Sequence, residues 1–228
     1  NGLEIGNIWG KFIIKKIKFL RSLMKSDMRE IKKVFLSFCD SKLYRSADRI
    51  ERQAKKMGIY SEIIVANENS LEKSFIDRYS DKLVYGSKGF GYWCWKPQII
   101  LQTLKDLDEG DIIQYTDVGC HLNKNGVQRL EYYFKMTQDS NNGILAFEAK
   151  IPEYPLVYDG RVLPDLVEYK WTKGDLFDYF GVRNNRKITH SQSMGATVIF
   201  IKKCNTSINF IRQWLEVFKS DFSYIDDT

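Results

Sequence analysis

From Val34 onward, short apolar runs alternate with segments that have a helical pattern. The apolar runs are typical of buried strands, and they cover residues 34–39, 62–66, 112–116, 143–147 and 196–201. Strands that alternate with helices predict an α/β fold, in which a mostly parallel sheet is flanked by helices and joined by right-handed crossovers. We place this domain at residues 34–228.

Turn and capping residues set the expected bounds of the helices between these runs. Gly58 has the position of a residue that follows a helix end, and Pro97 suits the first turn of a helix because it lacks an N–H. The predicted helices are 45–57, 71–79 after Ser70, 97–106, a helix from Asn123 or Asn125 to about Gln138, 174–180, and 206–219 after Asn205 or Thr206. Residues 150–172 hold the other three prolines and are expected to be irregular.

The first 33 residues carry the whole net charge of the chain. They contain nine Lys or Arg and three acidic residues, a net charge of +6, whereas residues 34–228 hold 26 of each sign. On a helical wheel of residues 8–33 most basic side chains lie opposite the apolar ones, which include Trp9 and Phe12. A basic amphipathic helix of this kind is typical of a segment that lies on an anionic membrane surface. Packing against the domain or a second subunit is the alternative.

Several classes of protein do not fit the sequence. A nucleic-acid-binding domain would carry its charge on the folded face, and residues 34–228 are neutral. No uninterrupted apolar stretch suits a signal peptide or a membrane span. The four widely spaced cysteines predict free thiols in a reducing compartment, with no zinc site. We therefore expect a cytoplasmic protein, peripheral at the inner face of the cytoplasmic membrane.

Two segments point to a ligand site. The predicted strand 112–116 ends in Asp117, and ligands of open α/β sheets bind just outside the carboxyl ends of strands. Residues 89–97 supply two glycines, the aromatic rings of Phe90, Tyr92, Trp93 and Trp95, and Lys96 at the start of the next helix. Together the segments indicate a site for a phosphorylated ligand that has a flat or cyclic part. A strand-end Asp that only caps a turn is the alternative.

The segment Gln114-Tyr-Thr-Asp-Val-Gly119 resembles the Asp-x-Asp segment of nucleotide-sugar glycosyltransferases with the GT-A fold. The resemblance implies a GT-A-like (Rossmann-like) sheet and a Mg²⁺ or Mn²⁺ ion held by Asp117 against the diphosphate. Hard cations of this kind bind carboxylate and phosphate oxygens, and they neutralise charge on a leaving diphosphate. Gly119 replaces the second acid, so Asp117 binds the ion either alone with water and phosphates or with His121.

A wider set of motifs narrows the resemblance to bacterial glycosyltransferases of capsule and lipopolysaccharide O-antigen assembly. The motifs are Gly91-Tyr-Trp-Cys-Trp-Lys-Pro97, the segment 110–120, Trp171-Thr-Lys-Gly-Asp175 and Gln192-Ser-Met-Gly-Ala196. The resemblance implies an enzyme that transfers a hexose from a UDP-sugar to a lipid-linked or growing surface polysaccharide, with galactose favoured over glucose. It also implies further sequence after residue 228.

The same resemblance assigns the donor-binding residues. Phe38, Cys39, Asp40 and Ser41 would receive the uracil and ribose, Lys96 would pair with the diphosphate, and Trp95 and Arg49 would complete the site. Each assignment has a purely structural alternative. These alternatives are a buried strand and turn at residues 38–41, an exposed lysine at the start of a helix, and an aromatic core that holds at least two of Tyr92, Trp93 and Trp95.

The acceptor side is assigned by chemistry. Glu148 and Asp175 are candidates for positioning the acceptor hydroxyl or taking its proton, and Gln192 for facing the transferred sugar. Asp175 also suits a helix N-cap, and His190 is interpreted as a loop residue. Because Gly119 replaces an acid, a second hypothesis stays open: a catalytically degenerate glycosyltransferase-like adaptor in a polysaccharide assembly complex.

Overall fold

The computed structural model of the chain describes residues 29–149, 157–158, 161–162 and 166–227. The chain divides into two compact units, residues 1–31 and 32–228. Nearly all of the predicted amphipathic helix lies outside the described residues. Residues 29–32 have no regular secondary structure and strand β1 starts at Lys33, so the helix does not continue to residue 33 as predicted.

A five-stranded sheet in the order β2-β1-β3-β7-β4 forms the centre of residues 32–228. Its strands are β1 (Lys33–Phe38), β2 (Glu62–Ala66), β3 (Ile112–Thr116), β4 (Ile144–Glu148) and β7 (Met194–Lys202). The five predicted strands are therefore confirmed, with small shifts at their ends. A separate hairpin pairs β5 (Val157–Tyr158) with β6 (Arg161–Val162).

The sheet is mixed, so the prediction of a mostly parallel sheet is confirmed in part, at the end formed by β2, β1 and β3. Strand β1 runs parallel to β2 and β3, but β7 lies between β3 and β4 and is antiparallel to both. The physical reason is the connection that precedes β7. Parallel pairing requires a crossover over one face of the sheet, and among the described residues between β4 and β7 each helix has four to six residues.

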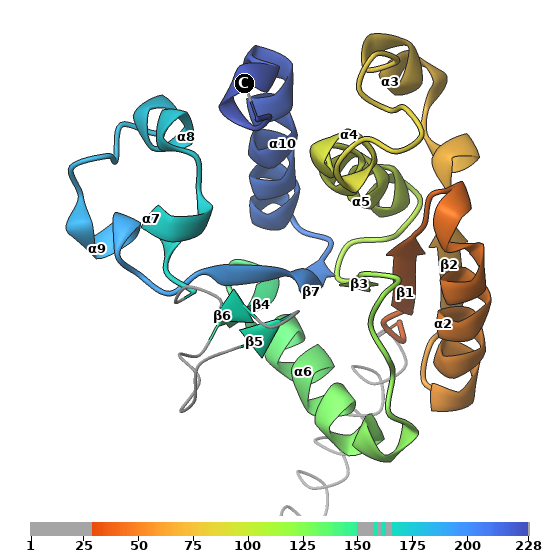
Figure 1. Cartoon of the computed structure of the whole chain (residues 1–228). Helices are drawn as coiled ribbons and strands as arrows, with labels where there is room; N and C mark the ends of the chain where they lie inside the picture. The colour runs from red at the N-terminus through yellow and green to blue at the C-terminus, as the bar shows by residue number, and fades with distance from the viewer. Residues whose placement is uncertain (1–28, 150–156, 159–160, 163–165, 228) are drawn as a thin grey trace, which may run out of the picture. The chain divides into compact units, whose positions relative to one another are not determined.

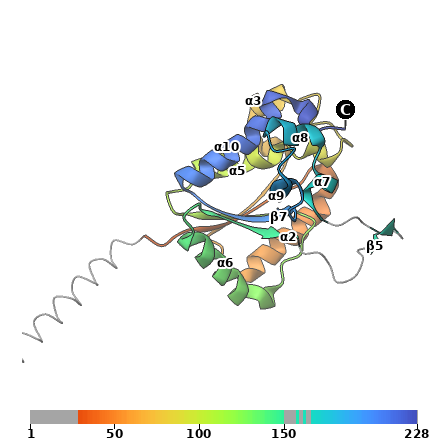
Figure 2. The ribbon, with the colours of Figure 1, turned by 90° about the vertical axis from the view of Figure 1, so that its left-hand side faces the viewer.

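Helices cover both faces of the sheet (Figures 1 and 2). Helices α5 (Trp95–Lys105) and α10 (Asn205–Ser220) lie on one face, and α2 (Tyr44–Met57) and α6 (Val127–Asp139) lie on the other. Successive residues of β1 pack against the two helix layers in turn, because side chains along a strand point alternately to opposite faces of the sheet. Val34 and Leu36 pack in the cluster that includes α5 and α10, and Phe35 packs with Ile50 of α2.

Shorter helices lie in the connections, and within the described residues every helix is too short or too polar to cross a membrane. They are α3 (Lys73–Arg78), α4 (Gly89–Tyr92), α7 (Glu168–Trp171), α8 (Gly174–Tyr179), α9 (Arg186–Thr189) and the 3₁₀ turns η1 (Ser41–Leu43), η2 (Glu68–Ser70), η3 (Lys124–Gly126) and η4 (Phe222–Tyr224).

Several predicted helix ends are confirmed and others are wrong. Gly58 follows α2 with a φ of 70°, as predicted for a residue after a helix end. Asn123 caps the turn η3 that leads into α6. Helix α5 begins at Trp95, two residues before the predicted start. Ser70 belongs to η2 and does not cap α3, and Cys204 is the N-cap residue of α10.

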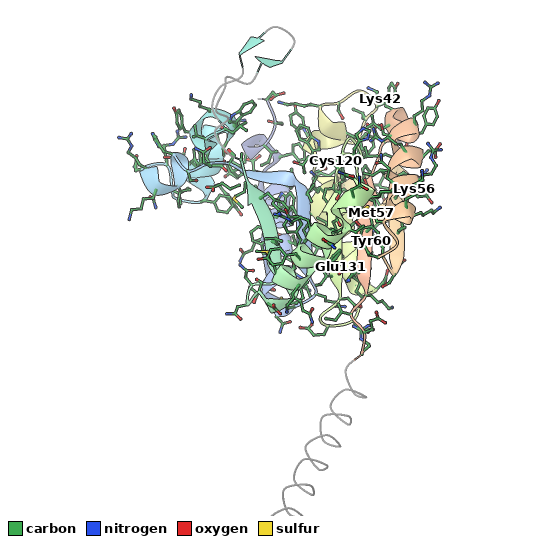
Figure 3. All side chains as sticks on the ribbon, turned by 90° about the horizontal axis from the view of Figure 1, so that it is seen from below. Lys42, Lys56, Met57, Tyr60, Cys120 and Glu131 are labelled. Carbon is green, nitrogen blue, oxygen red and sulfur yellow. The ribbon has the colours of Figure 1, made fainter. Side chains whose placement is uncertain are left out.

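The strand order creates a switch point between β1 and β3. From β1 the chain passes through α2 to β2 on one side, and then crosses to β3 on the other side of β1. The carboxyl ends of two such strands form a crevice, which is where ligands bind in open α/β sheets. In Figure 3, Lys42 and Cys120, which follow β1 and β3, lie toward the same end of the domain, and Tyr60 and Glu131 lie toward the other end.

Candidate functional site

A cavity of about 320 Å³ lies at this switch point. Its walls come from the residues that end β1 and β3, from the turn 89–93 together with Trp95, and from Thr197 of β7. The segments that the sequence analysis singled out therefore meet around one cavity. The predicted donor-binding residues that lie on its walls are Phe38, Cys39, Asp40, Trp95, Asp117 and Gly119.

Asp117 is held firmly by one of its two carboxylate oxygens. Its Oδ1 accepts a hydrogen bond from the hydroxyl of Tyr115 at 2.7 Å and lies 2.8 Å from Nζ of Lys96. Within the described part of the chain, Oδ2 has no hydrogen-bond partner. The side chain does not cap the turn that follows β3, so the turn-cap alternative is wrong; that turn closes through the backbone, from the N–H of Cys120 to the carbonyl of Asp117.

Lys96 is buried beneath Asp117. The lysine side chain is 5% exposed and the carboxylate 31% exposed, so the ion pair connects the protein interior to the cavity wall. Lys96 Nζ also donates to the carbonyl of Ala196 at 3.0 Å and lies 4.9 Å from the centre of the Tyr115 ring. The alternative of an exposed lysine at the start of a helix is therefore wrong. Lys96 is not among the residues that line the cavity.

Among the described residues, both charged side chains on the cavity wall are acidic. They are Asp40 and Asp117, and Lys96 offsets the charge of the second from behind. Asp40 also accepts a hydrogen bond from the backbone N–H of Lys42 through Oδ1. An anionic diphosphate would be repelled by these carboxylates unless a cation entered with it, because like charges at short range repel strongly where water is partly excluded.

The predicted metal ligands fit a cation only in part. Both ring nitrogens of His121 are occupied, at 2.9 Å from Arg49 Nη1 and 3.2 Å from Gln53 Nε2, and His121 is not on the cavity wall. No cluster of three or more His, Cys, Asp or Glu side chains suited to a metal occurs in the described residues. Oδ2 of Asp117 is the remaining candidate ligand atom for a cation. Because Mg²⁺ is often bound through one or two carboxylates plus phosphates and water, this set fits a cation carried by a phosphorylated ligand.

Arg49 stabilises the turn after β3 by hydrogen bonds made from outside the cavity. Its Nη2 donates to the carbonyls of Val118 at 2.5 Å and Cys120 at 3.1 Å. The guanidinium group thereby fixes the backbone that follows Asp117. Ser41 lies in the exposed turn η1 and, like Arg49, is not among the lining residues.

The glycine- and aromatic-rich turn before α5 has an unusual backbone. Residues 89–93 all have positive φ, including Phe90 at 49°, Tyr92 at 52° and Trp93 at 60°. Glycine adopts a positive φ freely, but for each other residue this conformation costs about 1–2 kcal/mol of free energy. Hydrogen bonds compensate: Ser87 Oγ accepts from the N–H of Gly91, and the carbonyl of Gly89 accepts from Nε1 of Trp95.

Tyr92, Trp93 and Trp95 have different environments. Trp95 is 6% exposed and stacks on Phe38 with ring centres 3.9 Å apart. Tyr92 is half-buried and Trp93 is 45% exposed. The alternative in which at least two of them belong to the core is therefore wrong. The left-handed backbone is the reason, because it turns Trp93 outward while α5 holds Trp95 inside.

The predicted acceptor-side residues do not line this cavity. Glu148 is exposed at the end of β4, opposite Met194. Asp175 lies in the first turn of α8 and does not cap that helix. Its Oδ2 is 3.5 Å from Nζ of Lys173. In the orientation that satisfies its hydrogen bonds, the amide nitrogen of Gln192 donates to the carbonyls of Ala149 at 3.0 Å and Leu166 at 3.3 Å.

Sequence reasoning missed several wall residues. Leu43, Phe90, Val118 and Thr197 contribute to the cavity, but none belongs to a residue type with obvious chemistry. Cys120 also lines it, and burial together with the nearby Asp117 carboxylate raises the pKa of its thiol. The spacing of Gly89 and Gly91 was the available signal for the left-handed turn. No signal could have placed Thr197, which comes from a strand 80 residues away from Asp117 in the sequence.

Comparison with protein-family models, with curated proteins and with solved structures gives no match for this chain.

Proposed function

We propose that this chain is a glycosyltransferase that transfers a hexose from a UDP-sugar to a lipid-linked or growing surface polysaccharide. Galactose is favoured over glucose as the hexose. The observation that carries the proposal is the cavity at the β1/β3 switch point. The two most specific motif segments, 91–97 and 114–119, both contribute to its walls. A switch-point crevice is the usual ligand site of an open α/β sheet, and nucleotides are common ligands there.

The arrangement of Asp117 suits a role at a departing diphosphate. Lys96 and Tyr115 hold its Oδ1, which fixes the direction of the carboxylate without using Oδ2. A Mg²⁺ or Mn²⁺ ion that enters with the diphosphate would be held by Asp117, and it would neutralise the charge that develops on the leaving nucleoside diphosphate. A pre-oriented group of this kind needs little reorganisation during the reaction.

Binding and turnover of UDP-galactose and UDP-glucose test this proposal. We expect the wild-type chain to bind UDP in calorimetry with Mn²⁺ present, and EDTA to weaken that binding. Asp117→Asn should weaken Mn²⁺-dependent binding at least about tenfold and lower transfer by about 100-fold or more, in the range found for lost electrostatic stabilisation. The matched control is Asp77→Asn, an exposed carboxylate of α3 that pairs only with Lys73 in the described structure. Failure of the wild-type chain to bind any uridine nucleotide at millimolar concentration would reject the proposal.

One observation favours the second candidate, a non-enzymatic adaptor. Gly119 replaces an acid, and the described residues contain no complete metal-ligand cluster. An adaptor would support polysaccharide synthesis in cells when Asp117→Asn and Lys96→Met are combined, whereas an enzyme would not.

Glu148, Asp175 and Gln192 remain our proposed residues for the acceptor side of the glycosyltransferase. If Glu148 acts on the acceptor hydroxyl, Glu148→Gln should lower the transfer rate without changing UDP affinity.

We also propose that residues 8–33 bring the protein to an anionic membrane, at the inner face of the cytoplasmic membrane. The support is the +6 charge of residues 1–33 and the apolar side of the helical pattern. The full chain should float with vesicles that contain phosphatidylglycerol and not with phosphatidylcholine vesicles. A gel shift with RNA or DNA in place of flotation would contradict this.

A further inference from the structure

Trp93 differs from the other aromatic side chains on the wall of the switch-point cavity. It is 45% exposed, whereas Phe38 is 2% and Trp95 is 6% exposed, and Phe90 is half-buried. Trp95 uses its Nε1 to bond the carbonyl of Gly89, but no such bond is found for the indole of Trp93 in the described part of the chain. Trp93 therefore contributes little to the core and presents a large apolar ring to the cavity.

The protein holds this ring in place through an unfavourable backbone. Trp93 has a φ of 60° and is the last of five consecutive residues with positive φ. Its ring lies against Gly89 so closely that a Cβ at that glycine would meet three ring atoms at 2.4, 2.5 and 2.9 Å. Two features therefore favour glycine at position 89: its own φ of 56° and the space that the indole of Trp93 occupies. Strain of this kind is concentrated at functional sites, where other interactions over-determine it.

We infer that Trp93 is the stacking platform for the flat ring of the ligand, which in a UDP-sugar is the uracil base, and that the left-handed turn positions it. This inference rests on the proposed function. A base has an apolar π-face, which matches an indole and its lining neighbours Leu43 and Phe90. A hexose carries hydroxyl groups around its ring and needs more polar partners than these side chains offer. Phosphates are disfavoured by Asp40 and Asp117 unless a cation intervenes.

Calorimetric titrations with UDP and UDP-galactose, both with Mn²⁺, test the inference. Trp93→Ala should weaken the binding of both ligands by the same factor, about 5- to 100-fold, which is the range for a lost base–aromatic stack. Trp93→Phe should restore most of the affinity. Trp171→Ala is the matched control, because Trp171 is 50% exposed and does not line this cavity. It should leave both affinities unchanged.

Gly89→Ala tests the positioning of the ring separately from its presence. A methyl group at Gly89 should displace the indole and weaken UDP binding about as much as Trp93→Ala does. In the double variant Gly89→Ala, Trp93→Ala the second change should add almost nothing, because both substitutions remove the same contact. Quenching of tryptophan fluorescence by UDP should be lost in Trp93→Phe and kept in Trp171→Phe. Circular dichroism checks that each variant is folded.

The outcomes separate this inference from the proposed function. If wild-type protein binds UDP and Trp93→Ala binds it equally well, the inference is wrong and the proposed function stands. If Trp93→Ala weakens UDP-galactose but not UDP, the ring faces the sugar and the inference is also wrong. If the wild-type chain binds no uridine nucleotide, both fail. If Gly89→Ala does not fold, the Phe and Ala variants at Trp93 still decide the question.

Discussion

The molecule has two neighbouring cavities on the same strand, and they differ in chemistry. Ala196 of β7 lines an apolar groove of about 500 Å³, whereas the next residue, Thr197, lines the switch-point cavity of about 320 Å³. The larger groove lies among β4, β7, α8 and α10, and among the described residues its carboxylate and amide side chains are Glu168 and Gln213. The smaller cavity has two carboxylates, a buried lysine behind one of them, and a strained aromatic turn.

Cavity volume alone therefore does not identify the candidate site. A site for a polar ligand needs a few converging polar groups as well as apolar walls. Those groups meet where the carboxyl ends of β1 and β3 come together, and the groove beside α10 lacks them. The switch-point cavity also carries unfavourable features, a buried charge and left-handed residues, that a purely structural region would have no reason to keep. Four predictions test this contrast.

Breaking the Lys96–Asp117 ion pair should have the largest effect on stability. Removal of one partner of a buried pair leaves the other charge without compensation, which costs about 3–5 kcal/mol in the free energy of unfolding. Because Asp117 is 31% exposed, we expect about 3 kcal/mol for Lys96→Met in urea unfolding at pH 7. The double variant Lys96→Met, Asp117→Asn should lose less than the sum of the two single losses.

The control for this prediction is the exposed pair of Lys73 and Asp77 on α3, whose side chains are 87% and 59% exposed. Lys73→Met should cost about 0.5 kcal/mol or less. An equal loss for Lys96→Met and Lys73→Met would mean that the ion pair under the cavity is not effectively buried.

Alkaline pH should weaken the region beneath the aromatic turn. Burial raises the pKa of the Cys94 thiol from the ordinary 9.0 to about 12. A thiol with a raised pKa in the folded state stabilises the fold fully below pH 9, and this stability is lost as the pH rises toward 12. We expect the free energy of unfolding to fall by about 1.4 kcal/mol per pH unit within that window. Cys94→Ala should reduce the slope; an unchanged slope would contradict the prediction. Burial also raises the pKa of Tyr115, so a residual slope is expected.

Adding a carboxylate at residue 119 should strengthen Mn²⁺ binding if Asp117 holds a cation at the switch-point cavity, as proposed. Gly119 lines the cavity, and a Cβ added there would meet no atom within 4 Å. Gly119→Asp should therefore fold normally and raise the affinity for Mn²⁺ in the presence of UDP by about tenfold, since a second carboxylate suits a hard cation. Gly119→Ala is the matched control and should behave like the wild type. Equal Mn²⁺ affinity in all three proteins would count against a cation at Asp117.

Filling the apolar groove should have the smallest effect. Ala146 of β4 lines it, and Ala146→Leu adds apolar surface that the groove has room to bury. We expect a change of about 1 kcal/mol or less in the free energy of unfolding, and no change in UDP affinity. A loss of UDP affinity of more than about threefold would show that the two cavities act together and are not independent sites.

Local patterns were enough to predict most of the elements. The five strands are apolar runs because the sheet is covered on both faces, and burial on both faces leaves no polar alternation. Gly58 and Asn123 were recognised because each satisfies a backbone requirement of its own turn. The cavity at Asp117 was predicted for a similar reason, since the end of a strand in an α/β sheet is a ligand position whatever the side chains are.

Long-range contacts explain what was missed. The direction of β7 depends on how the chain returns after residues 149–193, and no short pattern encodes that. The burial of Lys96 depends on Ala196, which lies 100 residues away in sequence and reaches the lysine only because β7 lies beside β3. Arg49 and His121 were predicted as ligand contacts, but their partnership with the turn after β3 appears only when α2 packs beside it.

Local periodicity and turn chemistry were sufficient to predict the alternation of strands and helices and the position of one carboxylate at the end of β3. The folded chain was needed to show which oxygen of Asp117 is held, which of the two lining tryptophans is exposed, and that Thr197 completes the cavity wall. Those outcomes depend on strand pairing and on a left-handed turn, which packing between distant segments selects.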